Sequence, residues 1–294
     1  KLRRASLSNA CKSCSVPEGD TLHRAARQLA PRLMGKAVRA LDLIRRADST
    51  AGLVGQPVTG VEARGKNLLV HFEGGLSLHV HLKMNGRILL YRQDEGRRPG
   101  PNAVAVLDTD EHRVIVDHAP VARLIRTQDL VRDLHFRNLG PDLIADNFDL
   151  EEALTRLRLR KEVPLGQALM DQSAVAGIGN VWKSELCFNL KLDPFAPVAA
   201  ASEDELRALL SMARKLMIET VERAPRRLPD PFAPRGGQRQ ARLNHRHGQK
   251  RLSVYERAGE RCYDCGTSIQ MKTQGEQLRS TYYCPSCQPS RSSA

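Results

Sequence analysis

The sequence predicts a multidomain α+β protein, in which an N-terminal β-sandwich with a flanking helix precedes a helical domain and a small cysteine-rich segment. Three observations predict this class. Short runs of alternating polarity fill the first part of the chain, helical periodicity replaces them beyond about residue 129, and two pairs of cysteines lie near the C-terminus. A length of 294 residues also favours more than one domain.

The first predicted element is a helix over residues 17–33, which would flank the sandwich. Pro17 stands at its first position, where a missing N–H is tolerated. Glu18 and Asp20 lie in the first turn, where the helix dipole favours acidic side chains. The apolar stripe that would face the core consists of Leu22, Ala25, Ala26 and Leu29.

Alternating polarity predicts the strands of a β-sandwich over roughly residues 35–120. The clearest run is residues 76–82, where apolar residues alternate with polar ones. We interpret His79 and His81 in this run as partly exposed sheet residues rather than as metal ligands. Further β-rich runs cover residues 38–44, 58–72, 103–107 and 114–116. Hairpin turns are predicted at Gly74-Gly75 and Asn85-Gly86.

Beyond about residue 129 the periodicity of apolar residues becomes helical. Ser202 and Glu205 have the spacing of a capping box, which predicts that a helix begins at residue 203. The predicted helices cover residues 149–159, 165–172, 181–188 and 203–223.

Between two of these helices lies the sequence Gly177-Ile178-Gly179-Asn180. Two glycines allow a tight turn that brings backbone N–H groups close to a phosphate, and the N-terminus of the next helix adds a favourable dipole. Alone the motif is weak evidence, because an ordinary helix–helix turn has the same composition.

Four cysteines provide the most specific pattern in the chain. Cys262, Cys265, Cys284 and Cys287 form a C-x2-C…C-x2-C set with 18 residues between the pairs, a spacing typical of a zinc ribbon. Four thiolates complete a tetrahedron around one zinc ion, and so short a segment has too little apolar surface to fold without it. We therefore expect one structural zinc ion. The alternative of two disulfides needs an oxidising compartment, which nothing else suggests.

The charge of the chain favours a polyanionic partner. The net charge is +13 and the isoelectric point is about 9.8, so nucleic acid is the leading candidate. Residues 224–261 contain ten Lys or Arg and three acidic residues, and their first half is rich in Pro, Gly and Gln. We interpret this stretch as a mobile linker that contacts phosphate, the alternative being a solvated linker without a ligand. No apolar run approaches the length of a membrane span.

Four motifs together carry a resemblance to a known family. They are Pro17-Glu18-Gly19-Asp20, Arg64-Gly65-Lys66-Asn67, Ala176-Gly177-Ile178-Gly179-Asn180 and Arg279-Ser280-Thr281-Tyr282-Tyr283-Cys284-Pro285-Ser286-Cys287-Gln288. In order and approximate spacing, residues 17–288 resemble the formamidopyrimidine-DNA glycosylase/endonuclease VIII family. The run Pro-Glu-Gly-Asp-Thr is similar to the actinobacterial type of endonuclease VIII.

This resemblance implies a β-sandwich catalytic domain, a helix-two-turns-helix domain and a C-terminal zinc finger, with damaged DNA in the cleft between them. It divides the chain into a disordered or artefactual extension (1–16), the catalytic domain with its N-terminal helix (17–128), the helix-two-turns-helix domain (129–224), a basic linker (225–253), the zinc finger (254–288) and a tail (289–294).

The resemblance also implies removal of an oxidised base, followed by cleavage of the strand at the abasic site. An N-terminal proline is a secondary amine with a pKa of about 8, so Pro17 could attack C1′ and form a Schiff base. Glu18 beside it would act as general acid or base. In the family, the lysine that matches Lys66 assists β-elimination from a hairpin, and the arginine that matches Arg279 holds phosphate during δ-elimination.

Other residues are expected to contact the DNA. The resemblance implies that Asn180 binds backbone phosphates, together with the turn of Gly177 and Gly179. Extrusion of a base leaves a space in the stack that must be filled. Met84, beside Lys83 at a predicted hairpin tip, is a flexible apolar side chain that can wedge between base pairs. The alternative is a methionine of the core.

Pro17 is preceded by sixteen residues in this sequence, and an internal proline nitrogen is an amide without a nucleophilic lone pair. Val16 stands where an initiator is expected, so its removal would expose Pro17; we favour this explanation. Proteolytic processing would have the same result. The third explanation is a real extension on a protein that binds damaged DNA without lyase activity. Residues 1–16 are basic and rich in serine, which predicts disorder, and Cys11 and Cys14 have no matching pair.

We therefore expect a bifunctional DNA glycosylase and abasic-site lyase of base excision repair. It would act as a monomer in the bacterial cytoplasm, associated with the nucleoid, on duplex or single-stranded DNA. Oxidised pyrimidines are the expected substrates and oxidised purines the alternative. A damaged-DNA-binding protein without catalysis is a second alternative. An RNA-associated zinc-ribbon protein is disfavoured by the four motifs.

Overall fold

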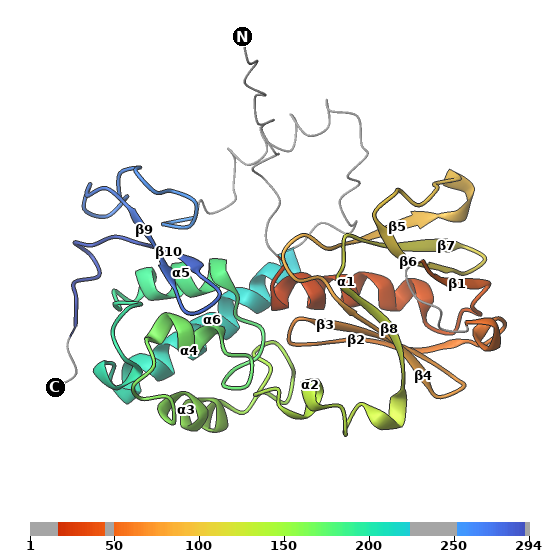
Figure 1. Cartoon of the computed structure of the whole chain (residues 1–294), viewed down its shortest axis with the longest axis horizontal. Coiled ribbons are helices and arrows are strands. Elements are labelled where there is room, and N and C mark those ends of the chain that lie inside the picture. Colours follow the sequence, from red (N-terminus) through yellow and green to blue (C-terminus); the bar gives the residue numbers. More distant parts are fainter. Residues whose placement is uncertain (1–16, 45–49, 224–251, 292–294) are drawn as a thin grey trace, which may run out of the picture.

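The computed structural model describes residues 17–44, 50–223 and 252–291. Figure 1 shows a β-rich half, which contains α1 and the strands β1 to β8, beside a helical half that carries the hairpin of β9 and β10. Each half has its own cluster of buried apolar side chains. The predicted α+β class, with a sandwich, a helical domain and a cysteine-rich finger, is confirmed.

The described part of the β-rich half contains two antiparallel four-stranded sheets. One has the strand order β1-β6-β7-β5 and the other β2-β3-β4-β8. Apolar side chains of both sheets and of α1 share one core, so the sheets form the predicted sandwich. The strands are β1 (Ala40–Leu43), β2 (Val58–Arg64), β3 (Asn67–Phe72), β4 (Leu76–His81), β5 (Arg87–Arg92), β6 (Ala103–Asp108), β7 (His112–Asp117) and β8 (Val121–Arg126).

Helix α1 (Gly19–Leu33) packs against β2 and β3, and also contacts α6 (Glu203–Arg223) of the helical half. Its apolar stripe is buried in the sandwich core. The helix begins at Gly19 and not at Pro17, because Glu18 occupies the N-cap position with extended backbone (φ −121°, ψ −174°). The predicted start was therefore two residues too early. The consequence is that Glu18 is free to interact outside its own helix.

The polar face of β4 is buried, which the alternating pattern does not predict. Ser77 is 0% and His79 3% exposed, because the segment after β8, with the short helix α2 (Leu134–Arg137), covers this face. The His79 ring packs edge-on against Phe136, with ring centroids 4.8 Å apart. The expectation of a partly exposed His79 was wrong, whereas His81 is partly exposed.

The turn between β4 and β5 is wider than the predicted Asn85-Gly86 pair. It is closed by a hydrogen bond of 2.9 Å from the Gly86 N–H to the Leu82 carbonyl. The residue in the left-handed region is Lys83 (φ 51°). Gly86 is required because a Cβ at this position would lie 2.6 Å from the Leu82 carbonyl oxygen. The turn therefore presents Lys83 and Met84, both exposed, at its tip.

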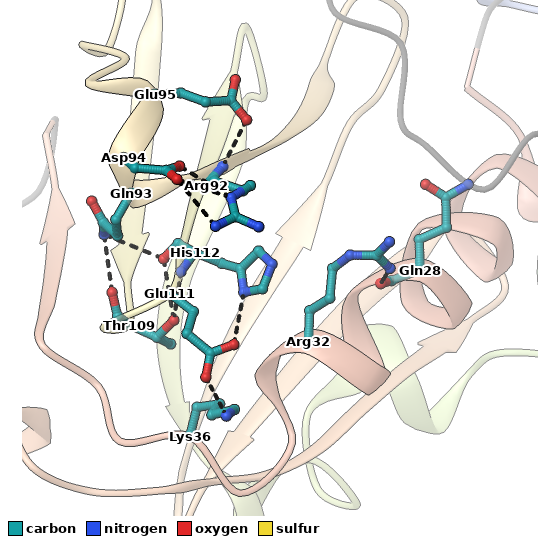
Figure 2. A network of polar contacts seen from close by, with 10 residues as sticks. All are labelled: Gln28, Arg32, Lys36, Arg92, Gln93, Asp94, Glu95, Thr109, Glu111 and His112. Atoms are coloured by element: carbon teal, nitrogen blue, oxygen red, sulfur yellow. Dashed lines mark hydrogen bonds and ion pairs between the residues drawn. The ribbon is translucent and has the colours of Figure 1, made fainter.

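A polar network fastens one end of the sandwich to the segment after α1 (Figure 2). Lys36 forms an ion pair of 2.5 Å with Glu111 in the turn between β6 and β7. Gln93, after β5, donates from Nε2 to the carbonyls of Thr109 and His112. The ion pair is largely exposed, so solvent screens it and it adds little to stability. This network contains none of the residues predicted for the site.

The helical half contains the four predicted helices. Ser202 and Glu205 form the predicted capping box, with reciprocal hydrogen bonds of 2.9 and 3.1 Å. Helices α3 and α5 contact α6, and α4 packs on α5. The helices are α3 (Leu150–Arg158), α4 (Leu165–Met170), α5 (Asn180–Asn189) and α6 (Glu203–Arg223). Short 3-10 turns are η1 (Ala51–Leu53), η2 (Gln93–Glu95), η3 (Thr127–Asp129) and η4 (Val198–Ala200).

The C-terminal finger is a hairpin of β9 (Gln270–Gln274) and β10 (Arg279–Tyr283). Strand β10 contacts α5, and Figure 1 shows the hairpin against this helix. Phe188 of α5 completes the small apolar core of the finger. The finger is therefore docked on the helical half. Within the three described ranges, no helix is long and apolar enough to cross a membrane.

Candidate active site

The carboxylate of Glu18 lies at the N-terminus of α5. It accepts hydrogen bonds from the N–H groups of Gly179 (3.0 Å), Val181 (2.7 Å) and Trp182 (3.3 Å). These N–H groups have no partner within the helix and carry partial positive charge, so they stabilise a carboxylate. Glu18 is only 2% exposed. Two predicted motifs that lie 161 residues apart thus meet in one buried site.

Close packing explains the glycines of both motifs. A Cβ at Gly179 would lie 2.3 Å from Glu18 Cδ, and one at Gly19 would lie 2.7 Å from Gly177 Cα. The predicted role of the glycine turn needs correction, because its N–H groups are engaged inside the protein: Gly177 donates to Gln172 Oε1 (3.1 Å) and Gly179 to Glu18. The anion at this helix N-terminus is the Glu18 carboxylate.

Replacing Gly179 by alanine is expected to displace Glu18 from the helix N-terminus, because the new methyl carbon overlaps the carboxyl group. We expect a loss of about 1–3 kcal/mol of stability, measured by thermal unfolding. Gly52→Ala is the matched control, because a Cβ at Gly52 meets no atom within 4 Å. Equal melting temperatures of the two variants would contradict this packing.

Lys66 lies in the tight turn between β2 and β3, as predicted. Gly65 adopts a left-handed conformation (φ 57°), and Asp142 Oδ2 accepts its N–H at 2.6 Å. The same carboxylate bonds His23 Nε2 at 2.9 Å. Burial would raise the pKa of Asp142, but the His23 and Gly65 contacts hold it below its usual range. Asp142 therefore anchors the Lys66 turn to α1.

Asn67 fixes the same turn from the sheet side. Its Nδ2 donates to the Arg64 carbonyl, and its Oδ1 bonds His79 Nε2 and His135 Nε2, each at 2.9 Å. Arg123 Nε donates to His79 Nδ1 at 3.2 Å. Burial lowers the pKa of His79 to about 3, so this imidazole is neutral at neutral pH. The histidines line a cavity of about 270 Å³ beside the β4–β5 turn.

Glu18 and Lys66 influence each other's charge. Burial raises the pKa of Glu18 to about 7, against the opposing effects of the Lys66 charge and the α5 N–H groups, and the Asp20 charge adds to the rise. Burial lowers the pKa of Lys66 to about 8, against the charge of Glu18, and the Arg279 charge adds to the decrease. Near neutral pH both groups are therefore suited to proton transfer.

Replacing Lys66 by methionine is expected to raise the pKa of Glu18 further. The Lys66 cation favours the ionised carboxylate, so its removal favours the protonated form and moves the Glu18 titration above about pH 7. A pH titration of the 13C-labelled Glu18 carboxyl by NMR measures the shift. Lys66→Arg retains the charge and is expected to leave the titration near its original pH. A lower Glu18 pKa in Lys66→Met would contradict the coupling.

Arg279 of the finger and Met84 of the sandwich are in contact. Arg279 Nη1 lies 2.8 Å from Met84 Sδ. Met84 is 41% exposed, which excludes the alternative of a core methionine. Arg279 also lowers the pKa of Lys66, so the structure brings the predicted wedge and the finger arginine close to Lys66.

The Asn180 side chain is tied to the protein. Its Nδ2 donates to Ser280 Oγ at 3.0 Å, and its Oδ1 accepts from Lys183 Nζ at 2.7 Å. Asn180 is only 5% exposed. Its contact with DNA phosphate stays a prediction, and its role in the free protein is to join α5 to β10.

Sequence reasoning missed the residues that hold the site together. Their partners are distant in sequence, such as the 119 residues between His23 and Asp142, so periodicity gives no signal for them. Residue type alone could have marked the lysine and the glutamate that lie between apolar residues of α5. The missed residues are Asp142, Lys183 and Glu185.

The four predicted cysteines form a cluster that could hold a metal ion. Their Sγ atoms all lie within 4.8 Å of one another. Pairs at 3.4 Å (Cys265 and Cys284) and 3.9 Å (Cys262 and Cys287) are too long for disulfides, which need about 2.05 Å. Tetrahedral zinc with Zn–S bonds of about 2.3 Å places sulfur atoms roughly 3.8 Å apart. The cysteine cluster therefore fits one zinc ion.

Several predictions fall outside the described residues. They concern the extension 1–16, with Cys11 and Cys14, the tail beyond residue 291, and most of the basic linker 225–253.

The chain matches two family models. Residues 16–123 match the formamidopyrimidine-DNA glycosylase N-terminal domain, and residues 139–228 match the formamidopyrimidine-DNA glycosylase H2TH domain. "Probable endonuclease 8 2" of Streptomyces coelicolor is 38% identical over 277 residues, which cover 93% of this chain and 94% of the relative. "DNA-(apurinic or apyrimidinic site) lyase Nei2" of Mycolicibacterium smegmatis is 35% identical over 274 residues, covering 93% and 99%.

Solved structures share the fold. The MutM (Fpg) protein of Thermus thermophilus superposes with a TM-score of 0.72 at 29% identity, covering 92% of this chain and 98% of its own. The Lactococcus lactis Fpg bound non-covalently to DNA with an AP site has a TM-score of 0.73 at 20% identity, covering 93% and 100%.

Proposed function

Because the chain belongs to the formamidopyrimidine-DNA glycosylase family, we propose that it is a DNA repair enzyme that excises oxidised pyrimidines and cleaves the strand at the abasic site. The observation that carries this proposal is the buried Glu18, with its pKa raised to about 7 beside Lys66 and directly after Pro17. Relatives named endonuclease 8 and DNA-(apurinic or apyrimidinic site) lyase support it. The protein is a bifunctional DNA glycosylase and lyase.

In the proposed first step, the amine of an N-terminal Pro17 attacks C1′ of the damaged nucleotide. The glycosidic bond breaks, and its electron pair leaves with the base, which takes a proton from solvent. Glu18 accepts the proton that the nitrogen loses and returns it to O4′ as the sugar ring opens and the iminium forms. A pKa of about 7 suits both halves of this transfer.

Two eliminations follow from the iminium. Loss of a C2′ proton expels the 3′ phosphate. Loss of a second proton then expels the 5′ phosphate. The sugar fragment is thereby released from both DNA ends and stays attached to the enzyme. We assign assistance in the first elimination to Lys66, whose pKa of about 8 leaves a share of its amine able to accept a proton. We assign the binding of phosphate during the second to Arg279.

The exposed tip of the β4–β5 hairpin is the proposed wedge. Met84 would fill the space that the extruded nucleotide leaves, and Lys83 beside it would bind backbone phosphate. Asn180 would border the phosphates on the helical side. The net charge of +13 favours this polyanion. Because the proposed substrate is DNA, we propose that the enzyme acts beside the chromosome in the bacterial cytoplasm.

The reaction requires Pro17 at the N-terminus. The family match begins at residue 16, directly before Pro17, which supports Val16 as the position of the initiator. Removal of residues 1–16 would convert the Pro17 nitrogen from an amide to a nucleophilic amine.

The finger, proposed to span residues 254–288, would hold one zinc ion between Cys262, Cys265, Cys284 and Cys287. The ion supplies structure, because four thiolates leave no open position for a reactant. The catalytic domain (17–128) and the helical domain (129–224) are the other proposed units.

The test is excision and nicking of duplex and single-stranded oligonucleotides that carry one oxidised pyrimidine, one oxidised purine or one abasic site. We expect the form that starts at Pro17 to release the oxidised pyrimidine fastest and to nick the abasic strand. Faster release of the purine would overturn the proposed preference. Salt-sensitive binding without release or nicking would identify a damaged-DNA-binding protein instead.

A further inference from the structure

Lys183, in the first turn of α5, is a buried lysine that the proposed reaction does not use. It is 1% exposed and is one of the largest fully buried side chains among the described residues. Its ammonium donates to Asn180 Oδ1 (2.7 Å), Thr281 Oγ1 (2.8 Å) and the Ser280 carbonyl (3.1 Å). A lysine has three N–H donors, so these contacts satisfy it completely.

These three acceptors are uncharged, although a buried ammonium usually needs a charged partner. Burial lowers the pKa of Lys183 to about 8; the charge of Glu18 opposes the decrease, and the charges of Arg279 and Lys66 add to it. Burial of the Lys183 ammonium costs free energy, which indicates that this side chain does more than fill the core. Two of its three acceptors belong to β10, next to Arg279.

Other groups of α5 bind the same finger. The Glu185 carboxylate accepts the N–H groups of Ser253 (2.8 Å), Val254 (2.9 Å) and Tyr255 (2.9 Å). Ser184 Oγ accepts the Tyr282 N–H at 3.3 Å. Residues 183–185 thus attach both ends of the finger to the helix whose N-terminus binds Glu18.

Helix α5 is therefore the common support of two catalytic groups from opposite ends of the chain. Glu18 is fixed at its N-terminus, and Arg279 is fixed through Lys183 and β10. The two attachments lie within the first turns of a single helix, so one element sets the spacing of the two groups.

We propose that Lys183 is a positioning residue for the second elimination. Its ammonium holds β10 against α5, so that Arg279 faces the departing phosphate. This role rests on the proposed function. Schiff-base formation uses Pro17 and Glu18, which do not contact the finger through Lys183, so we expect it to proceed without the contact between Lys183 and β10. The ratio of β- to δ-elimination product reports the role, because this ratio does not depend on the amount of folded enzyme.

The experiment is a product analysis on abasic-site DNA with the form that starts at Pro17. Lys183→Met retains the aliphatic stem and removes the ammonium. We expect its β-to-δ product ratio to rise about 10- to 100-fold, since a displacement of about 1 Å has effects of this size, while borohydride trapping of the Schiff base stays within about twofold. In an Arg279→Ala background, Lys183→Met is expected to change the ratio no further, because the two residues act together.

Lys191→Met is the matched control. Lys191 also bridges from the end of α5 to the finger, through Asp264, but this ion pair is exposed, so its loss is expected to leave the product ratio unchanged. If Lys183→Met fails to fold, Thr281→Val removes one acceptor of the ammonium at constant size and is expected to shift the ratio in the same direction.

An unchanged ratio in Lys183→Met, or an equal further shift in the Arg279→Ala background, would overturn the positioning role while leaving the proposed function in place. If the parent enzyme forms no trapped Schiff base, the proposed function itself fails and this role with it.

Discussion

Glu18→Gln is expected to reduce base excision by about 10²- to 10⁴-fold, the range of general acid–base catalysis. Burial raises the pKa of Glu18 to about 7, so at neutral pH the carboxyl group can both accept and return a proton. A glutamine can do neither. Single-turnover release of an oxidised pyrimidine, with enzyme in excess over DNA, measures the loss without interference from product release.

The structure offers a matched control in Glu185→Gln. Like Glu18, Glu185 is a buried carboxylate that accepts three backbone N–H groups. Both changes leave an amide where two oxygens accepted hydrogen bonds, so each is expected to cost about 1–3 kcal/mol of stability. Only Glu18→Gln is expected to lose excision. Equal excision rates in the two variants would show that Glu18 serves structure alone.

Cys284→Ser is expected to release the metal ion and to unfold the finger. Cys284 is fully buried and belongs to the apolar core that includes Phe188 of α5. Zinc contributes about 10–16 kcal/mol to the folding of zinc-finger peptides, more than so small an apolar core can replace. Arg279 would leave the site, so the second elimination is expected to be lost. Zinc content and limited proteolysis of the finger measure the change.

Cys187→Ala is the control for this experiment. Cys187 is a buried cysteine of α5 outside the cluster, and its removal is expected to retain the metal and the finger. Unaltered zinc content in Cys284→Ser would contradict the four-cysteine site.

Much of the fold follows from local sequence signals. The capping box at Ser202 fixes the start of α6, and the Gly74-Gly75 turn closes its hairpin where expected, with Gly75 at φ 77°. Strand β8 escaped prediction because its residues do not alternate cleanly in polarity. The burial of the polar face of β4 was not predicted, because the helix that packs on this face, α2, belongs to a distant segment whose own sequence pattern is weak.

In the candidate site, too, local motifs predict single residues, whereas contacts between distant segments are not predicted. The motifs marked Glu18, Lys66 and Arg279 as single residues, and the structure brings them together. The helix N-terminus that suggested a phosphate site holds the Glu18 carboxylate instead, because a protein anion satisfies the same N–H groups. Lys183 could not be predicted to join α5 to the finger, since its acceptors lie 97 and 98 residues further along the chain.

The central claim is that the Pro17 nitrogen is the nucleophile. The direct measurement is borohydride trapping on abasic-site DNA, with the 294-residue chain and the form that starts at Pro17 compared side by side, followed by mass-spectrometric mapping of the adduct. We predict that only the shorter form is trapped and that the DNA fragment is attached to the Pro17 nitrogen. An adduct on Lys66 or another lysine, or no adduct in either form although both bind the DNA, would contradict the account.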